Sequence, residues 1–245
     1  MAVRQNIRLA ILFLILLTFP ITLNYFSVYL IIESAGQRII AFTFIFWSLF
    51  TVTALLFGRA ACSYVCPLGA IQEVKDRMAG KKLAKIKYLK WTKYVMAVLW
   101  VGAIAAAAIS AGGYQTVNLL YKTESGVSVD SVQSWLTYFS IVLVVLLPVF
   151  FIGKRGFCHY FCPWGVLNIS ATKVKNFFKW PSLRMKAASD KCKQCHACDR
   201  NCPMSLEVSK AVLAGNMNNT ECILCGTCAD GCPNGTIAYS CRRGS

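Results

Sequence analysis

Four long apolar runs, separated by polar and basic segments, dominate the pattern of the chain. They cover residues 9–32, 39–58, 94–113 and 133–153, and none contains a charged residue. Because a helix rises 1.5 Å per residue, each run is long enough to cross the roughly 30 Å of hydrocarbon in a bilayer. Little sequence remains to cover such helices in a soluble protein, so the pattern predicts four membrane-spanning helices.

The first apolar run could also be read as a signal peptide, since Arg4 and Arg8 precede it. Its apolar stretch is longer than the roughly 7–15 residues of a signal peptide, and no A-x-A-like cleavage site follows it. We therefore expect a retained helix. Pro20 and Asn24 within it suggest a kink, or a polar contact with a neighbouring helix.

Basic residues are distributed unevenly around these runs. Of the 26 Lys and Arg residues, 24 lie before the first run, between the second and third, or after the fourth, and only Arg38 and Lys122 lie in the other two loops. The positive-inside rule then places both termini in the cytoplasm. The formal net charge of +16 needs no nucleic-acid partner, because the basic segment 81–93 suits a helix at the lipid surface.

The end of the chain repeats one cysteine pattern, C-x-x-C-x-x-C-x-x-x-C-P, and a reducing cytoplasm disfavours disulfides there. The copies are Cys192, Cys195, Cys198, Cys202-Pro203 and Cys222, Cys225, Cys228, Cys232-Pro233. Structural zinc would need neither the third cysteine nor the proline, whereas bacterial-type two-[4Fe–4S] ferredoxins use both, and each fourth cysteine ligates the other cluster. The expected ligand sets are Cys192, Cys195, Cys198 and Cys232 for one cluster, and Cys222, Cys225, Cys228 and Cys202 for the other.

One part of this pattern also matches the C-x-x-C-H motif of c-type haem attachment, from Cys192 to His196. The cluster needs both of these cysteines, and the second copy of the run has no histidine. We therefore favour iron–sulfur ligation, with His196 as a polar surface residue beside a cluster.

A second repeat follows the even-numbered apolar runs, with the pattern R-x-x-C-x-x-x-C-P-x-G. Equivalent positions are 96 residues apart: Arg59/Arg155, Cys62/Cys158, Tyr64/Tyr160, Cys66/Cys162, Pro67/Pro163 and Gly69/Gly165. A parallel duplication packs about an axis along the membrane normal, which brings the two motifs face to face.

Four cysteines at this interface match the ligand count of a third [4Fe–4S] cluster, held by Cys62, Cys66, Cys158 and Cys162. Buried structural cysteines and a redox-active pair of dithiols are the alternatives. Three clusters use twelve of the 13 cysteines and leave Cys241, which we expect to be unliganded. Arg59 and Arg155 would anchor helices at the lipid headgroups or offset the charge of the cluster.

The four spans, the two C-x-x-x-C-P motifs and the doubled cysteine run resemble NapH-type membrane ferredoxins, the quinol dehydrogenase components associated with periplasmic nitrate reduction. The membrane portions of NosR- and MauN-type proteins share the layout. The resemblance covers nearly the whole chain. It implies an inner-membrane protein of bacteria or archaea that relays electrons between the quinone pool and a partner redox protein or subunit.

If quinone binds, the candidate side chains near the interfacial motif are His159, Tyr64, Tyr160 and Trp164, although aromatic residues there also serve as interfacial anchors. Two other functions remain open. One is a FixG-like accessory reductase of a metal or disulfide. The other is a membrane-anchoring electron-transfer subunit of a larger oxidoreductase, without a quinone site of its own.

The expected fold is an all-α membrane protein with four transmembrane helices in two parallel-repeat halves, followed by a small α+β ferredoxin domain. We place the first repeat at residues 1–93, the second at 94–186 and the cytoplasmic ferredoxin domain at 187–245.

Overall fold

The computed structural model describes residues 3–79, 82–123 and 126–242 of the chain. The membrane part contains α1 (Val3–Phe26), α2 (Val28–Gly36), β1 (Ile39–Ala41), α3 (Phe42–Phe57), α4 (Ala60–Tyr64), α5 (Pro67–Ala79), η1 (Tyr88–Trp91), α6 (Thr92–Ser110), β2 (Thr116–Asn118), α7 (Val132–Phe151), α8 (Gly156–Tyr160) and α9 (Pro163–Phe177). The tail contains β3 (Ser182–Ala187), η2 (Ser189–Lys191), α10 (Ala197–Asn201), α11 (Val208–Leu213), α12 (Thr227–Asp230) and β4 (Ile237–Arg242).

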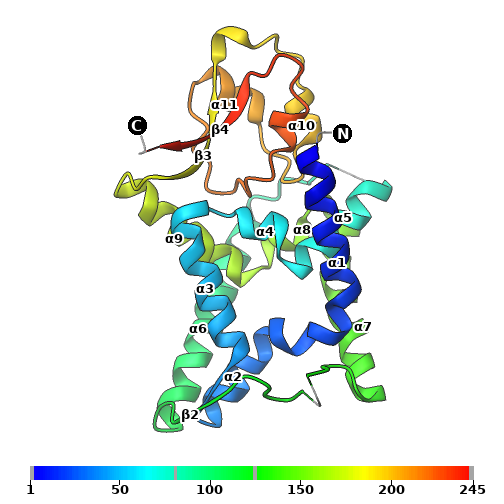
Figure 1. Cartoon of the computed structure of the whole chain (residues 1–245), viewed down its shortest axis with the longest axis vertical. Coiled ribbons are helices and arrows are strands. Elements are labelled where there is room, and N and C mark those ends of the chain that lie inside the picture. Colours follow the sequence, from blue (N-terminus) through cyan, green and yellow to red (C-terminus); the bar gives the residue numbers. More distant parts are fainter. Residues whose placement is uncertain (1–2, 80–81, 124–125, 243–245) are drawn as a thin grey trace.

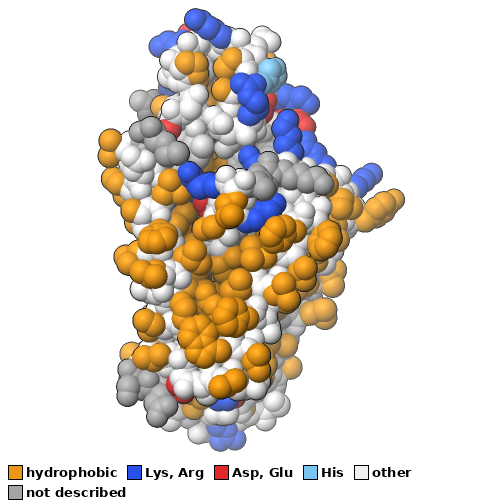
Figure 2. All heavy atoms as spheres, turned by 90° about the vertical axis from the view of Figure 1, so that its right-hand side faces the viewer, with side chains coloured by type: hydrophobic (Ala, Val, Ile, Leu, Met, Phe, Trp, Pro, Cys, Tyr) orange, Lys and Arg blue, Asp and Glu red, His pale blue; other side chains and the backbone are white. Residues whose placement is uncertain are grey.

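Long apolar helices form one end of the molecule and the cysteine-rich tail forms the other (Figure 1). Hydrophobic side chains cover much of the surface around the helices, whereas lysine and arginine side chains gather towards the tail (Figure 2). Three helical stretches are long and apolar enough to cross a membrane, namely Val3–Gly36, Tyr88–Ser110 and Val132–Phe151. The remaining expected span, α3, has 16 helical residues, so the four-span topology stays a prediction.

The first apolar run is not one helix with a kink at Pro20. Pro20 lies inside α1, and the chain breaks instead at Ser27, whose backbone is extended. Here the segment between α6 and α7 supplies polar partners: Asn24 N–H donates to Ser128 Oγ over 3.0 Å, and Ser128 N–H donates to the carbonyl oxygen of Ile21 over 3.0 Å. After the break, α2 turns across the molecule and packs against α6 (Figure 1).

The 96-residue repeat is visible in the elements themselves. Helices α4 and α8 are equivalent at both ends, and α5 and α9 both begin at the proline of the C-x-x-x-C-P motif. Each of these amphipathic helices packs on the span of the other repeat, with α5 against α7 and α9 against α3. The two cysteine motifs are thereby enclosed between the halves.

The tail folds around two equivalent turns and one strand pair. Strands β3 and β4 are antiparallel, with Ser182 opposite Arg242 and Ala187 opposite Ile237. Residues 182–186 therefore pair with the tail although they precede the boundary that we predict at residue 187, and that boundary stays a prediction. Both cysteine runs have left-handed backbone at equivalent places, Gln194 and His196 in the first and Leu224 and Gly226 in the second. At Gly226 an added Cβ would lie 2.7 Å from Tyr239 Oη, so a side chain would collide with β4.

Candidate metal centres

The two C-x-x-x-C-P motifs bring four thiols to one place between the repeats. Cys62 lies in α4 and Cys158 in α8, while Cys66 and Cys162 immediately precede α5 and α9. We call these four residues the interfacial set. Cys66, Cys158 and Cys162 are all buried. Burial raises the pKa of Cys162 to about 12, and the neighbouring thiols of Cys158 and Cys62 raise it too.

Hydrogen bonds to these sulfurs cross from one repeat to the other. Gln72 Nε2 donates to Cys158 Sγ over 3.0 Å, and Asn168 Nδ2 donates to Cys62 Sγ over 3.4 Å. Gln72 and Asn168 are themselves 96 residues apart, and each bonds the first cysteine of the opposite motif. The site therefore has approximate two-fold symmetry that extends beyond the cysteines.

The two motif arginines follow the same symmetry. Arg59 is 2% exposed and Arg155 is 0% exposed, so both lie inside the protein and not at lipid headgroups. Arg155 Nη1 donates to the carbonyl oxygen of Cys62 over 3.2 Å and would lie 3.0 Å from a Cβ added at Gly69. The corresponding distance from Arg59 Nη2 to a Cβ added at Gly165 is 3.4 Å. The motif glycines thus leave space for the opposite guanidinium groups.

This donor set fits an iron–sulfur cluster. Four thiols, three buried and that of Cys62 partly buried, would have to ionise together to act as ligands, and crowded thiolates in an apolar site need positive charge beside them. Arg59 and Arg155 supply part of it, and the irons of a cluster would supply the rest. Within residues 3–79, 82–123 and 126–242, no three His, Cys, Asp or Glu side chains are grouped for a single metal ion. The cysteine ligands of a multi-iron cluster are held apart by the width of the cluster. Cysteines that are too far apart to share a single ion are therefore compatible with a cluster.

In the tail, Cys202 joins the second cysteine run. Cys202, Cys222, Cys225 and Cys228 line one apolar cavity of about 40 Å³, and we call them the inner tail set. Burial raises the pKa of Cys202 to about 12, with further contributions from Cys225 and Cys222. Burial likewise raises the pKa of Cys222 to about 11. These four are the ligands that the crossed pairing predicts for one cluster.

The remaining four cysteines, Cys192, Cys195, Cys198 and Cys232, are the outer tail set. Cys192 lies close enough to Cys198 to raise its pKa, although burial is the larger cause, and Cys195 is exposed. The loop after Cys232 is tied to the start of the first run, because Asn234 Nδ2 and Thr236 Oγ1 both donate to the carbonyl oxygen of Lys191. Cys241 is exposed on β4, opposite Leu183.

The interfacial set and the inner tail set are in contact. Cys62 packs with Cys202 against a buried group formed by Met204, Ile223 and Cys225. The outer tail set has no member in this group. Members of both tail sets pack against a second buried group, so the inner tail set adjoins the interfacial set on one side and the outer tail set on the other.

Comparison with known sequences agrees with this division. The family described as "4Fe-4S binding domain" matches twice, at residues 39–86 and 134–181, and that described as "4Fe-4S dicluster domain" matches residues 191–237. The chain is a membrane-type iron–sulfur electron-transfer protein.

This iron–sulfur protein has relatives in archaea and bacteria. An uncharacterized protein of Methanocaldococcus jannaschii is 28% identical over 84% of the chain and 73% of its own length. The putative electron transport protein YccM of Escherichia coli is 24% identical over 79% of the chain and 54% of its own length. The methylamine utilization ferredoxin-type protein MauN of Paracoccus denitrificans is 27% identical over 71% of the chain and 57% of its own length. No solved structure is significantly similar to the chain.

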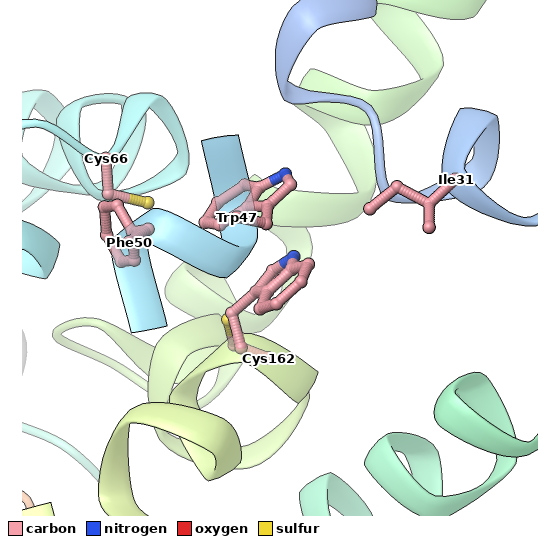
Figure 3. Close-up of a cluster of buried hydrophobic side chains, with 6 residues drawn as sticks. Ile31, Trp47, Phe50, Cys66 and Cys162 are labelled. Atoms are coloured by element: carbon pink, nitrogen blue, oxygen red, sulfur yellow. The ribbon is translucent and has the colours of Figure 1, made fainter. Parts of the chain in front are cut away.

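The four quinone-proximal candidates do not all face one site, although the rings of His159 and Tyr160 are in contact, with centroids 5.0 Å apart. Tyr160 is fully buried, and its hydroxyl donates to the carbonyl oxygen of Ala84 and accepts from Ile86 N–H. Trp164 stacks on Trp47, with ring centroids 4.5 Å apart. Both belong to the buried group that contains Cys66 and Cys162, and Figure 3 labels Trp47 and these two cysteines. The structure places Tyr64 beside Tyr239 of the tail.

His159 lines an open cleft, which has a volume of about 710 Å³. We call it the interface cleft. It lies between the basic segment that precedes α6, helix α9 and the tail. Burial lowers the pKa of His159 to about 4, so its ring is neutral at pH 7.

Several residues of the site escape motif reasoning. Gln72 and Asn168 lie outside the quoted motif, although their 96-residue spacing is a signal that a longer alignment of the two repeats would find. Glu73 and Glu221, the carboxylate partners of Arg155 and Arg59, carry no such signal, because they are not equivalent in the repeat.

Proposed function

We propose that the protein relays electrons between the quinone pool of a membrane and a redox partner. In this proposal the interfacial, inner tail and outer tail sets each hold one [4Fe–4S] cluster, which takes up and returns one electron at a time. The observation that carries it is the contact of Cys62 with the group around Cys225, which joins the membrane half to the tail. The resemblance to NapH-type ferredoxins supports the quinone end of the relay.

The surroundings of the sets suit different roles. The interfacial and inner tail sets are largely enclosed, whereas Cys195 of the outer tail set is exposed beside Lys193 and His196. We therefore assign the outer tail set to exchange with the partner. By the positive-inside rule, the tail and both chain ends would lie on the cytoplasmic side of a prokaryotic inner membrane.

We place the quinone head group in the interface cleft. His159 is 8% exposed, and its Nδ1 has no hydrogen-bond partner within the described part of the chain. The cleft is also lined by Trp91 and Tyr94, which offer apolar ring faces. His159 adjoins Cys158 in sequence and Glu221 adjoins Cys222, so a head group here would lie beside both sets. Its carbonyl oxygens would find hydrogen-bond donors in the lysines of the cleft wall.

Iron content tests the cluster assignment. Anaerobically purified protein is expected to contain about twelve iron atoms, and a Cys62→Ala/Cys158→Ala variant about eight. Cys241→Ala, which removes the exposed cysteine of β4, is the control and should keep twelve. Eight irons in all three proteins would refute the interfacial cluster and would transfer Cys62 and Cys158 to dithiol chemistry, as in an accessory reductase.

Quinol-driven reduction tests the cleft separately. His159→Ala should keep the wild-type iron content but slow the reduction of the clusters by a soluble quinol analogue about tenfold. In Tyr64→Phe, which alters a candidate outside the cleft, the quinol analogue should reduce the clusters at the wild-type rate. An unchanged rate in His159→Ala would remove the cleft as the quinone site. Absence of quinol reduction in the wild-type protein would favour an anchoring subunit that passes electrons only to protein partners.

A further inference from the structure

The two motif arginines are equivalent in the repeat, but their counterions are not. Arg155 Nη2 donates to Glu73 Oε2 over 2.9 Å, and Glu73 belongs to α5 of the membrane half. The position 96 residues after Glu73 is Ile169. Ile169 is 1% exposed and cannot pair with a guanidinium group. The second repeat therefore lacks the carboxylate that the symmetry would require for Arg59.

The tail supplies the missing carboxylate. Arg59 Nη1 donates to Glu221 Oε2 over 3.0 Å and approaches the carbonyl oxygen of Thr220 at 3.3 Å. The other oxygen of Glu221 pairs with Lys93 of α6, whose side chain is 2% exposed. Arg59 and Lys93 thus place two buried positive charges against one carboxylate. Both oxygens of the carboxylate are therefore engaged by cations of the membrane half.

The position of Glu221 in the chain links this ion pair to both cysteine sets. Glu221 immediately precedes Cys222 of the inner tail set, and Arg59 lies three residues before Cys62 of the interfacial set. Leu224, two residues beyond Cys222, packs on the same corner of the membrane half, because an added Cβ at Gly58 would lie 3.0 Å from its Cδ1. Separation of the tail would break this ion pair and remove the carboxylate partner of both Arg59 and Lys93.

We propose that Glu221 is a positioning residue that seats the tail on the membrane half and sets the redox potential of the interfacial site. It completes the charge balance of Arg59, and it holds the inner tail set against Cys62. The effect of Glu221 on the redox potential rests on the proposed three-cluster relay. Its role in holding the tail on the membrane half rests on the ion pair alone.

Redox titration tests the charge role. Glu221→Gln removes one negative charge beside the interfacial and inner tail clusters, so reduction of both should become easier. We expect about a tenfold change in the ratio of reduced to oxidised interfacial cluster at a fixed potential, which is a positive shift of about 59 mV for one electron. The outer tail cluster should not shift. Glu207→Gln is the matched control, because Glu207 also joins the tail to the membrane half, through Lys85, but its side chain is 48% exposed.

A double variant separates charge from structure. Arg59→Met alone should shift the interfacial potential in the negative direction, and Arg59→Met/Glu221→Gln should return it towards the wild-type value. If Glu221→Gln loses iron, the double variant should regain it, because it leaves no unpaired Arg59. Unchanged potentials in Glu221→Gln, or failure of the double variant to restore either property, would overturn the charge role.

Hydrogen exchange tests the seating role without reference to the number of clusters. In Glu221→Gln, the amides of residues 220–225 should exchange at least tenfold faster than in the wild-type protein, and in Glu207→Gln they should not change. Unchanged exchange in Glu221→Gln would overturn this role. Eight irons in the wild-type protein would refute the three-cluster relay, and the exchange result would still decide whether Glu221 seats the tail.

Discussion

Replacement of Glu73 by glutamine should destabilise the protein more than its one lost charge suggests. The carboxylate of Glu73 is 9% exposed and joins two buried guanidinium groups, that of Arg8 at 2.6 Å and that of Arg155 at 2.9 Å. Arg77 approaches it from the surface at 3.6 Å. Glutamine keeps the shape of the side chain but leaves Arg8 and Arg155 without a carboxylate, inside the contact between α1, α5 and the interfacial site.

The magnitude follows from the pKa of Glu73. Burial alone raises this pKa, but Arg155 and Arg8 more than offset it and lower the value from 4.5 to about 2. A difference of about 2.5 pKa units, at 1.36 kcal/mol per unit, corresponds to roughly 3 kcal/mol of folding stability at pH 7. Breaking a buried ion pair by removal of one partner costs a similar roughly 3–5 kcal/mol.

The pH dependence has a defined sign. Because the folded pKa is below the unfolded one, the stabilisation by Glu73 is fully present above about pH 4.5 and is lost as the pH falls towards about 2. The difference in unfolding free energy between the wild-type protein and Glu73→Gln should therefore be constant between pH 8 and pH 5.5. It should shrink only in more acidic solution.

Unfolding by SDS in mixed micelles, followed by circular dichroism under anaerobic conditions, measures this difference. Asp76→Asn is the matched control, since Asp76 lies one turn further along α5 and burial raises its pKa to about 6. Asp76→Asn should be more stable than the wild-type protein at pH 7, with an advantage that shrinks below about pH 6. A loss below about 1 kcal/mol in Glu73→Gln, or a difference that varies between pH 8 and pH 5.5, would contradict the assigned role.

Substitutions at four further positions test the packing around the interfacial set. Gln72→Leu and Asn168→Leu each remove one hydrogen bond to a cysteine sulfur; loss of about 1 kcal/mol should lower the interfacial potential by roughly 40 mV in a redox titration, and an upward shift would contradict this role. Tyr160→Phe removes the hydroxyl that bridges Ala84 and Ile86. We expect the free energy of unfolding to fall by about 1–3 kcal/mol and proteolysis within residues 82–87 to become faster. Unchanged proteolysis would show that this hydrogen-bonded anchor is dispensable. Trp164→Ala removes the ring that stacks on Trp47. It should lower the free energy of unfolding in SDS by about 3–5 kcal/mol, and Trp164→Phe should lower it less. Equal losses in the two variants would argue against a contribution from the ring stack.

Spacing along the chain was enough to predict the chemistry of this protein. The doubled cysteine run and the 96-residue repeat of R-x-x-C-x-x-x-C-P-x-G are local patterns, and cluster ligation depends on donor type and short spacing. The apolar runs likewise predicted a helical membrane half, because the length of a span follows from helix geometry and bilayer thickness. The same reasoning failed at Ser27, where the first run divides, since polar contacts from Ser128 in a distant loop coincide with the break.

Only the tertiary structure decided how the two halves and the tail are joined. Nothing near Arg59 in the sequence identifies Glu221 as its partner, and nothing near Arg155 identifies Arg8 as a second cation on Glu73. Likewise, the sequence gives no sign that three neighbouring candidates have different surroundings. His159 lines the interface cleft, Tyr160 hydrogen-bonds the loop at Ala84 and Ile86, and Trp164 stacks on Trp47. Ligand spacing is set by a few neighbouring residues of the backbone. Counterions and cleft walls come from distant segments, such as Arg59 and Glu221, which are 162 residues apart and which only folding brings into contact.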